Sequence, residues 1–170
     1  KIYYRNESGK WCSIYKFPNG KINHIHNIIQ DTKRDCLYIL SGDFGEAAAI
    51  WRVNTNFSSV IPIGTSGQDK RACWLQISGD SLIYATDSQL ESNHVSCIKI
   101  SGNEYLAPEL VQHVEGSSIY HAEFDSPKLI FSTAVEPDEV RGNKYLELFC
   151  TRKGPGIHSN YSFVYAGVWG

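Results

Sequence analysis

The sequence of 170 residues contains no methionine, no C-x-x-C pair and no apolar run as long as a membrane span. A helix needs about 20 apolar residues to cross a bilayer, so we expect no membrane-spanning helix and no membrane partner. Without C-x-x-C pairs, the usual zinc and redox motifs are not indicated. A chain that begins at Lys1, lacks methionine and shows no signal peptide is expected to be processed or cut from a longer one.

Charge is also scarce, because charged residues make up 20% of the chain, the net charge is −2 and the pI is near 6.3. No basic face is indicated, so we expect no nucleic-acid partner. The widely spaced cysteines lie mostly inside apolar patterns, which favours buried free thiols in a reducing, cytoplasmic compartment. A disulfide and secretion stay open as alternatives. The cysteines are Cys12, Cys36, Cys73, Cys97 and Cys150.

Convincing helical periodicity is missing as well. The run Glu46–Ala49 has helix propensity, but four residues cannot sustain a helix alone. Aromatic residues make up 12% of the chain, with ten Tyr and four Trp, and these residue types favour strands. The sequence therefore predicts an all-β chain.

The segment Cys36–Trp51 reads as a strand, an acidic glycine turn and a returning strand. Its first strand and acid, Tyr38–Asp43, recur in Leu82–Asp87, and the strand recurs again in Leu129–Ala134. The spacing is about 45 residues, which is typical of the blades of a β-propeller. First strands follow the same period, with His26, Trp74 and His121 in corresponding places.

We predict a β-propeller with about three full four-stranded blades and partial terminal blades, as part of a larger, six-bladed propeller. A small four-bladed ring, in which 161–165 joins the blade begun by 2–17, is the alternative. The predicted repeats are 1–20 (a half blade), 24–63, 70–113, 118–153 and 160–170, where another blade begins.

Three short segments of the first full repeat, His24–His26, Ser41–Asp43 and Ile50–Arg52, resemble the BNR or Asp-box propellers of the sialidase-like superfamily. The resemblance continues in Tyr84–Ser88 with Asn93-His94 and covers about residues 24–134. It implies a propeller with a polar site at the mouth of its central channel.

The Asp-box itself, Ser-x-Asp-x-Gly-x-x-Trp, is degenerate in this chain. The turn where it belongs reads Asn54–Ser59 and contains neither Asp nor Gly. A sialidase also uses three arginines, and only Arg71 stands at an arguable inner-strand position. Sialidase activity is therefore not implied.

In a propeller the ends of inner strands meet at one channel mouth, so distant ionisable residues can converge there. Such a mouth could bind an acidic sugar, hold a divalent metal or supply a general acid–base pair. We expect catalytic roles for His26, Asp43, Asp87 and His121. We expect substrate-binding roles for His24, Arg71 and His94.

Structural roles compete with these functional ones. His24 and His26 share one strand face, which suits a metal but also suits hydrogen-bonded packing. Asp43 and Asp87 precede turns, where aspartate often caps backbone amides. Arg71 could pair with an acid at a blade junction, and the tryptophans at 51 and 74 are expected to pack between blades.

Two classes of function follow. The first is a carbohydrate-active propeller, a glycoside hydrolase or lyase with a carbohydrate ligand at the channel mouth. The second is a non-catalytic propeller scaffold that binds glycan or protein, since no complete catalytic motif is present. A homodimer, or the remainder of a longer chain, is expected to complete the ring.

Overall fold

The computed structural model describes residues 1–123, 129–134 and 148–150. These residues form antiparallel sheets with two single-turn 3₁₀ helices, η1 (Gly45–Ala47) and η2 (Gln68–Lys70). The predicted all-β class is confirmed. In the described part of the chain, no helix has the length and apolar character needed to cross a membrane. The predicted segment 160–170 and much of 118–153 lie outside the described residues.

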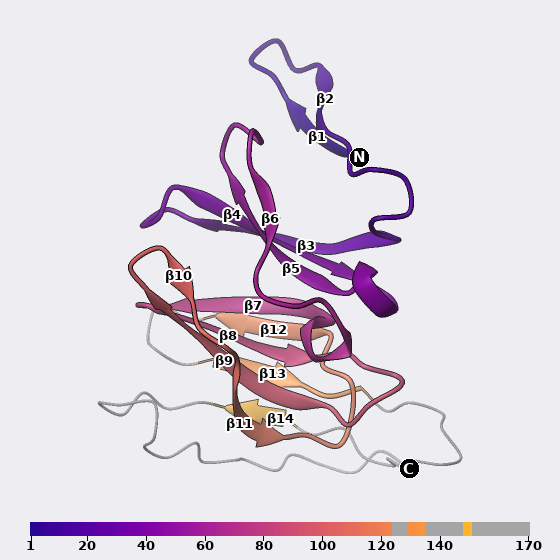
Figure 1. The fold of residues 1–170 in the computed structure, drawn as a ribbon, viewed down its shortest axis with the longest axis vertical. Helices are drawn as coiled ribbons and strands as arrows, with labels where there is room; N and C mark the ends of the chain where they lie inside the picture. The colour runs from indigo at the N-terminus through magenta and orange to yellow at the C-terminus, as the bar shows by residue number, and fades with distance from the viewer. Residues whose placement is uncertain (124–128, 135–147, 151–170) are drawn as a thin grey trace.

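Four sheets follow one another along the chain (Figure 1). The first is the hairpin β1 (Ile2–Arg5) and β2 (Trp11–Tyr15). The second contains β3 (His24–Asp31), β4 (Cys36–Gly42), β5 (Ala49–Asn54) and β6 (Val60–Pro62), each paired with the next. The third contains β7 (Ala72–Ser78), β8 (Ser81–Thr86), β9 (His94–Ser101), β10 (Glu104–Tyr105) and β11 (Glu109–His113). The fourth contains β12 (Tyr120–Glu123), β13 (Leu129–Ser132) and β14 (Leu148–Cys150).

In the third sheet, β10 and β11 share one place. Both pair with β9, β10 along its C-terminal half and β11 along its N-terminal half. The sheet is therefore a four-position meander whose last strand is broken in two.

The inner strands of the second and third sheets, β4, β5, β8 and β9, are buried on both faces. In β4, Tyr38 and Leu40 pack toward the third sheet, whereas Ile39 between them packs toward the hairpin. Successive side chains of a strand point to opposite faces, so a continuous apolar run is what a doubly covered strand requires. This explains why the runs in β4 and β8 contain apolar residues at nearly every position.

Three apolar clusters hold the four sheets together, one at each interface. The hairpin packs on the second sheet through contacts such as Phe17 against Trp51, whose ring centroids lie 5.2 Å apart. Tyr38 and Tyr84 are both buried between the second and third sheets. Trp74 lies between the third and fourth sheets, where it packs on Phe131. The expected packing role of Trp51 and Trp74 is therefore observed.

The first strands of the three larger sheets lie beside one another. Asn27 of β3 donates to the Cys73 carbonyl of β7 over 3.2 Å, and Trp74 of β7 donates to Ser118, just before β12, over 2.9 Å. This brings the start of β3 and β7, and the ends of their partners β4 and β8, to one edge of the stack.

The cysteine side chains that the structure describes are free thiols, at Cys12, Cys36, Cys73 and Cys97. The apolar strand patterns predict buried free thiols; Cys36 and Cys97 are buried as expected, whereas Cys12 and Cys73 are half-buried. The side chain of Cys150 lies outside the described residues.

Candidate functional site

Ionisable side chains from two neighbouring sheets meet at the edge where β3 and β7 begin. His24 and His26 come from β3, and Asp43 follows β4 directly. Arg71 precedes β7, and Asp87 follows β8 directly. The two aspartates occupy corresponding places in the two sheets, because Gly42 and Thr86 are the last residues of β4 and β8.

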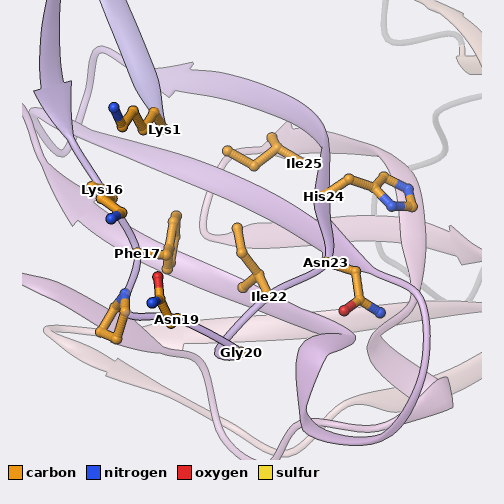
Figure 2. A pocket seen from close by; sticks show the side chains of 10 residues that line it. Lys1, Lys16, Phe17, Asn19, Gly20, Ile22, Asn23, His24 and Ile25 are labelled. Carbon is orange, nitrogen blue, oxygen red and sulfur yellow. The ribbon is translucent and has the colours of Figure 1, made fainter.

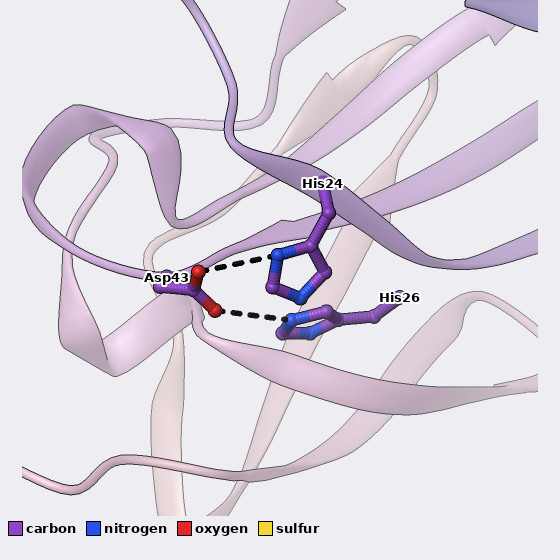
Figure 3. A group of neighbouring side chains, drawn as sticks. All are labelled: His24, His26 and Asp43. Atoms are coloured by element: carbon purple, nitrogen blue, oxygen red, sulfur yellow. Dashed lines mark ion pairs between the residues drawn. The ribbon is translucent and has the colours of Figure 1, made fainter.

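The carboxylate of Asp43 faces both histidine rings from one side, and each of its oxygens is directed toward one ring (Figure 3). Its Oδ2 is 3.2 Å from Nδ1 of His24, and its Oδ1 is 3.9 Å from Nε2 of His26. The His26 side chain is 5% exposed, whereas that of His24 is 52% exposed and that of Asp43 is 27% exposed. The group therefore has one buried member and two members that solvent reaches.

A β-bulge positions His26. The register of β3 against β4 shifts between Ile25 and Asn27, so His26 is the extra residue on its strand. Its Nδ1 lies 2.8 Å from the carbonyl oxygen of Ala72 in the next sheet. A carbonyl only accepts hydrogen bonds, so Nδ1 carries the hydrogen and Nε2 is directed toward Asp43.

Gly42 makes room for the His26 ring. A Cβ atom at position 42 would lie 2.4 Å from Nε2 of His26, well inside van der Waals contact. Glycine is therefore required here by the close approach of an imidazole ring.

Arg71 joins the two halves of the site. Its side chain is 7% exposed, and Nη2 lies 3.8 Å from Oδ1 of Asp43 and 3.6 Å from Oδ2 of Asp87. Its guanidinium lies 5.6 Å from the ring centroid of Phe44. Within the described residues, its buried Nε and Nη1 atoms have no hydrogen-bond partner. Buried donors nearly always have a partner, so an acceptor is expected beside these two nitrogens.

Cys73 is a member of the site that the sequence interpretation missed. Its Sγ lies 3.3 Å from Oδ2 of Asp87 and 3.5 Å from Nδ1 of His26. Burial, and then the neighbouring Asp87 carboxylate, raise the pKa of the Cys73 thiol to about 12. The thiol is therefore protonated at neutral pH and donates to Asp87; it is not a nucleophile. Its position two residues after Arg71 was the only available signal.

A buried polar network supports the loops around the site. Gln68 donates to the Asp43 carbonyl over 2.9 Å and accepts from Ser88 over 2.9 Å. Asn93 accepts from Thr86 and from the Ser88 amide, which fixes the loop that follows Asp87. Fully bonded buried networks of this kind keep a loop in one conformation. Sequence patterns gave no sign of the roles of Gln68 and Ser88.

Five of the seven predicted site residues meet in the cluster, and two lie elsewhere. His121 stacks on Trp74, with ring centroids 5.1 Å apart and an interplanar angle of 20°. Nδ1 of His94 lies 3.2 Å from the carbonyl oxygen of Ser92, two residues before it in the chain. Their predicted catalytic and substrate-binding roles are not tested by these positions, but the geometry does not join them to the cluster.

An open pocket of about 400 Å³ borders the cluster on the hairpin side (Figure 2). Figure 2 shows His24 at one end of the lining, Lys1 and Lys16 at the other, and Phe17 and Ile22 between them. The pocket lies between the hairpin and the start of β3, next to the exposed side chain of His24.

The fold and the site together define an all-β protein of packed antiparallel meanders with an ionisable cluster at one strand edge. Comparison with family models, curated proteins and solved structures finds no match for the chain.

Proposed function

We propose that the chain is part of a β-propeller of the BNR, sialidase-like type. The support is architectural: antiparallel meander sheets pack face to face, and their first strands lie side by side. In a propeller these first strands line the central channel, so the cluster of Arg71 and its neighbours would stand at the channel mouth.

At this mouth the protein binds an acidic carbohydrate and acts on it as a glycoside hydrolase or lyase. The observation that carries this proposal is Arg71, a buried guanidinium with Nε and Nη1 unpaired among the described residues. A guanidinium N–H forms a short, charge-assisted hydrogen bond to a carboxylate oxygen. The carboxylate of a uronic acid is an acceptor suited to one of these two N–H groups.

The neighbourhood of Arg71 suits a sugar. Phe44 is 49% exposed and lies beside the guanidinium, so it offers an apolar platform for the C–H face of a pyranose ring. The carboxylates and imidazoles around it are the residue types that transfer protons to sugar oxygen or from sugar carbon. Recognition and chemistry can therefore take place at one edge.

The test is binding of a uronic-acid oligosaccharide, compared with the same oligosaccharide esterified at its carboxyl groups. We expect the free acid to bind and the ester to bind at least about tenfold more weakly, since a charge-assisted hydrogen bond is lost. Arg71→Gln should remove this preference for the free acid. The control Arg52→Gln changes a half-buried arginine of β5 and should keep the preference. Equal binding of acid and ester by the unchanged protein would contradict the proposal.

Turnover separates the classes of enzyme. An unsaturated product with ultraviolet absorbance identifies a lyase, and new reducing ends without that absorbance identify a hydrolase. Binding with neither product supports the second candidate, a non-catalytic scaffold for glycan or protein. That candidate is favoured by the hairpin, where Tyr3, Tyr4 and Trp11 are 53%, 46% and 66% exposed. Exposed aromatic side chains of this kind mark recognition surfaces.

A further inference from the structure

We infer that His24, His26 and Asp43 form a binding site for a divalent transition-metal ion. Each side chain offers one ligand atom, and these atoms lie within 4.8 Å of one another. Two imidazoles and one carboxylate are a donor set that first-row divalent ions accept, with positions left open for further ligands. The inference is independent of the carbohydrate proposal, which depends on Arg71.

The orientation of His26 is the first argument for a cation. Its Nδ1–H is bound to the Ala72 carbonyl over 2.8 Å, so Nε2 of the neutral ring carries the lone pair. That lone pair faces Oδ1 of Asp43 over 3.9 Å. Two electron-rich atoms that face each other are stabilised by a cation between them. Metal-bound histidines commonly donate their other N–H to a backbone carbonyl in this way.

The second argument is that the buried ligand is held in place before an ion arrives. The bulge in β3 directs His26, the Ala72 carbonyl fixes its ring, and Gly42 leaves space for it. A ligand held by its surroundings loses little freedom on binding, which favours affinity.

Access and charge agree with this assignment. His24 is 52% exposed and Asp43 is 27% exposed, so an ion can enter from solvent and keep open positions toward it. With neutral imidazoles, Asp43 and Asp87 against Arg71 leave one net negative charge, which offsets part of the charge of a dication. Asp87 lies outside the ligand set and stays beside Arg71 as a carboxylate for proton transfer.

A second group, His26 with Cys73 and Asp87, also has its ligand atoms within 4.8 Å. The ring nitrogen nearest to Cys73 is Nδ1 of His26, at 3.5 Å, and this nitrogen already donates to the Ala72 carbonyl. Nε2 is directed toward Asp43 instead. The geometry therefore favours the group that contains His24.

The experiment is a titration of the chelator-treated chain with Co²⁺ alone, followed by the visible absorption of the bound ion. We expect saturable binding of one equivalent, and displacement of the Co²⁺ by Zn²⁺. His24→Gln, His26→Gln and Asp43→Asn should each weaken binding by about 100-fold or more, since losing even an outer-shell partner costs about 10–100-fold. The matched controls His113→Gln and Asp35→Asn change exposed residues of the same types and should bind as the unchanged chain does.

Three results would overturn the inference. The first is no saturable binding by the unchanged chain, and the second is full binding by His24→Gln, whose half-exposed side chain can be replaced without disturbing the fold. The third is an intense thiolate-to-cobalt band that disappears in Cys73→Ser, which would identify the second group. Circular dichroism of each variant separates a lost ligand from a lost fold. Because the probe is the metal alone, failure here leaves uronate binding by Arg71 untouched, and the reverse also holds.

Discussion

The second and third sheets place different side chains at the same point of the same scaffold. Both have a register irregularity near the start of the first strand, after Ile25 in β3 and after Ala72 in β7. In β3 the irregular residue is His26, whose ring faces Asp43. In β7 the irregular pair includes Trp74, whose ring is buried against the fourth sheet.

The difference shows that corresponding positions in the two sheets can serve either the fold or the site. An aspartate follows β4 and β8 alike, so the repeat supplies the acid in both sheets. In the second sheet the irregular position holds an imidazole that faces this acid, whereas in the third sheet the corresponding position holds Trp74, which packs in the core. Arg71, from the loop between the two sheets, then bridges the two aspartates.

The largest effect on stability is expected from replacing Trp74, the residue that packs in the core. Trp74→Ala removes a fully buried indole and its hydrogen bond to Ser118, so we expect a loss of about 3–5 kcal/mol in the free energy of unfolding. His24→Ala, at the half-exposed end of β3, should change it by less than about 0.5 kcal/mol. Urea unfolding of both variants makes the measurement. Similar losses in the two would contradict the division between core and site.

A smaller loss is expected from Gly42→Ala. The added Cβ would stand 2.4 Å from Nε2 of His26, so the ring must move, at a cost of about 1–3 kcal/mol. Cobalt binding should be lost at the same time. The double variant Gly42→Ala with His26→Ala removes the clash and should be less destabilised than the sum of the two single changes. Additive effects would show that the ring and the glycine do not compete for space.

The opposite edge of the two sheets is joined by ion pairs and predicts a pH effect. Burial alone would raise the pKa of Asp31, but hydrogen bonds from Arg34 outweigh it, so this pKa lies below its ordinary value of 3.8. A carboxyl whose pKa is lower in the folded state stabilises the fold above that ordinary value, and the stabilisation is lost as the pH falls through the lowered pKa.

Asp31→Asn tests this edge. We expect a loss of about 1–3 kcal/mol at neutral pH, because a buried hydrogen-bonded charge pair is broken. The variant should also lose part of the decline in stability at acid pH, measured by urea unfolding at several pH values. Asp35→Asn, in the same turn but exposed, is the control. An acid transition that is identical in Asp31→Asn and the unchanged chain would contradict the assignment.

The smallest effect is expected at an exposed ion pair that joins β9 and β11 of the third sheet. Lys99 lies 2.9 Å from Glu109, but the two side chains are 36% and 52% exposed. Exposed ion pairs contribute about 0–1 kcal/mol and are screened by salt. Lys99→Ala should therefore change stability by less than about 1 kcal/mol, with no change in uronate or cobalt binding. A larger loss in thermal or urea unfolding would show that the break between β10 and β11 depends on this pair.

The sequence pattern predicted most of the residues that meet in the cluster. It placed His24, His26, Asp43, Arg71 and Asp87 together because they stand at equivalent strand ends. It placed His121 with them on the same period, but β12 pairs with β13 without a bulge, and the ring stacks on Trp74. It left out Cys73, since a thiol inside an apolar strand pattern gives no sign of a carboxylate neighbour.

The sequence by itself determined the all-β class and the positions that recur, because side-chain alternation and turn residues act over a few neighbours. The tertiary structure alone decided which recurring positions became a site. The adjacent sheet decides the strand register, the bulge at His26 and the packing of Trp74. These features depend on contacts between residues more than 40 positions apart in the chain. The two Arg71 nitrogens that have no partner among the described residues are likewise a property of the assembled sheets, since only there is the guanidinium buried.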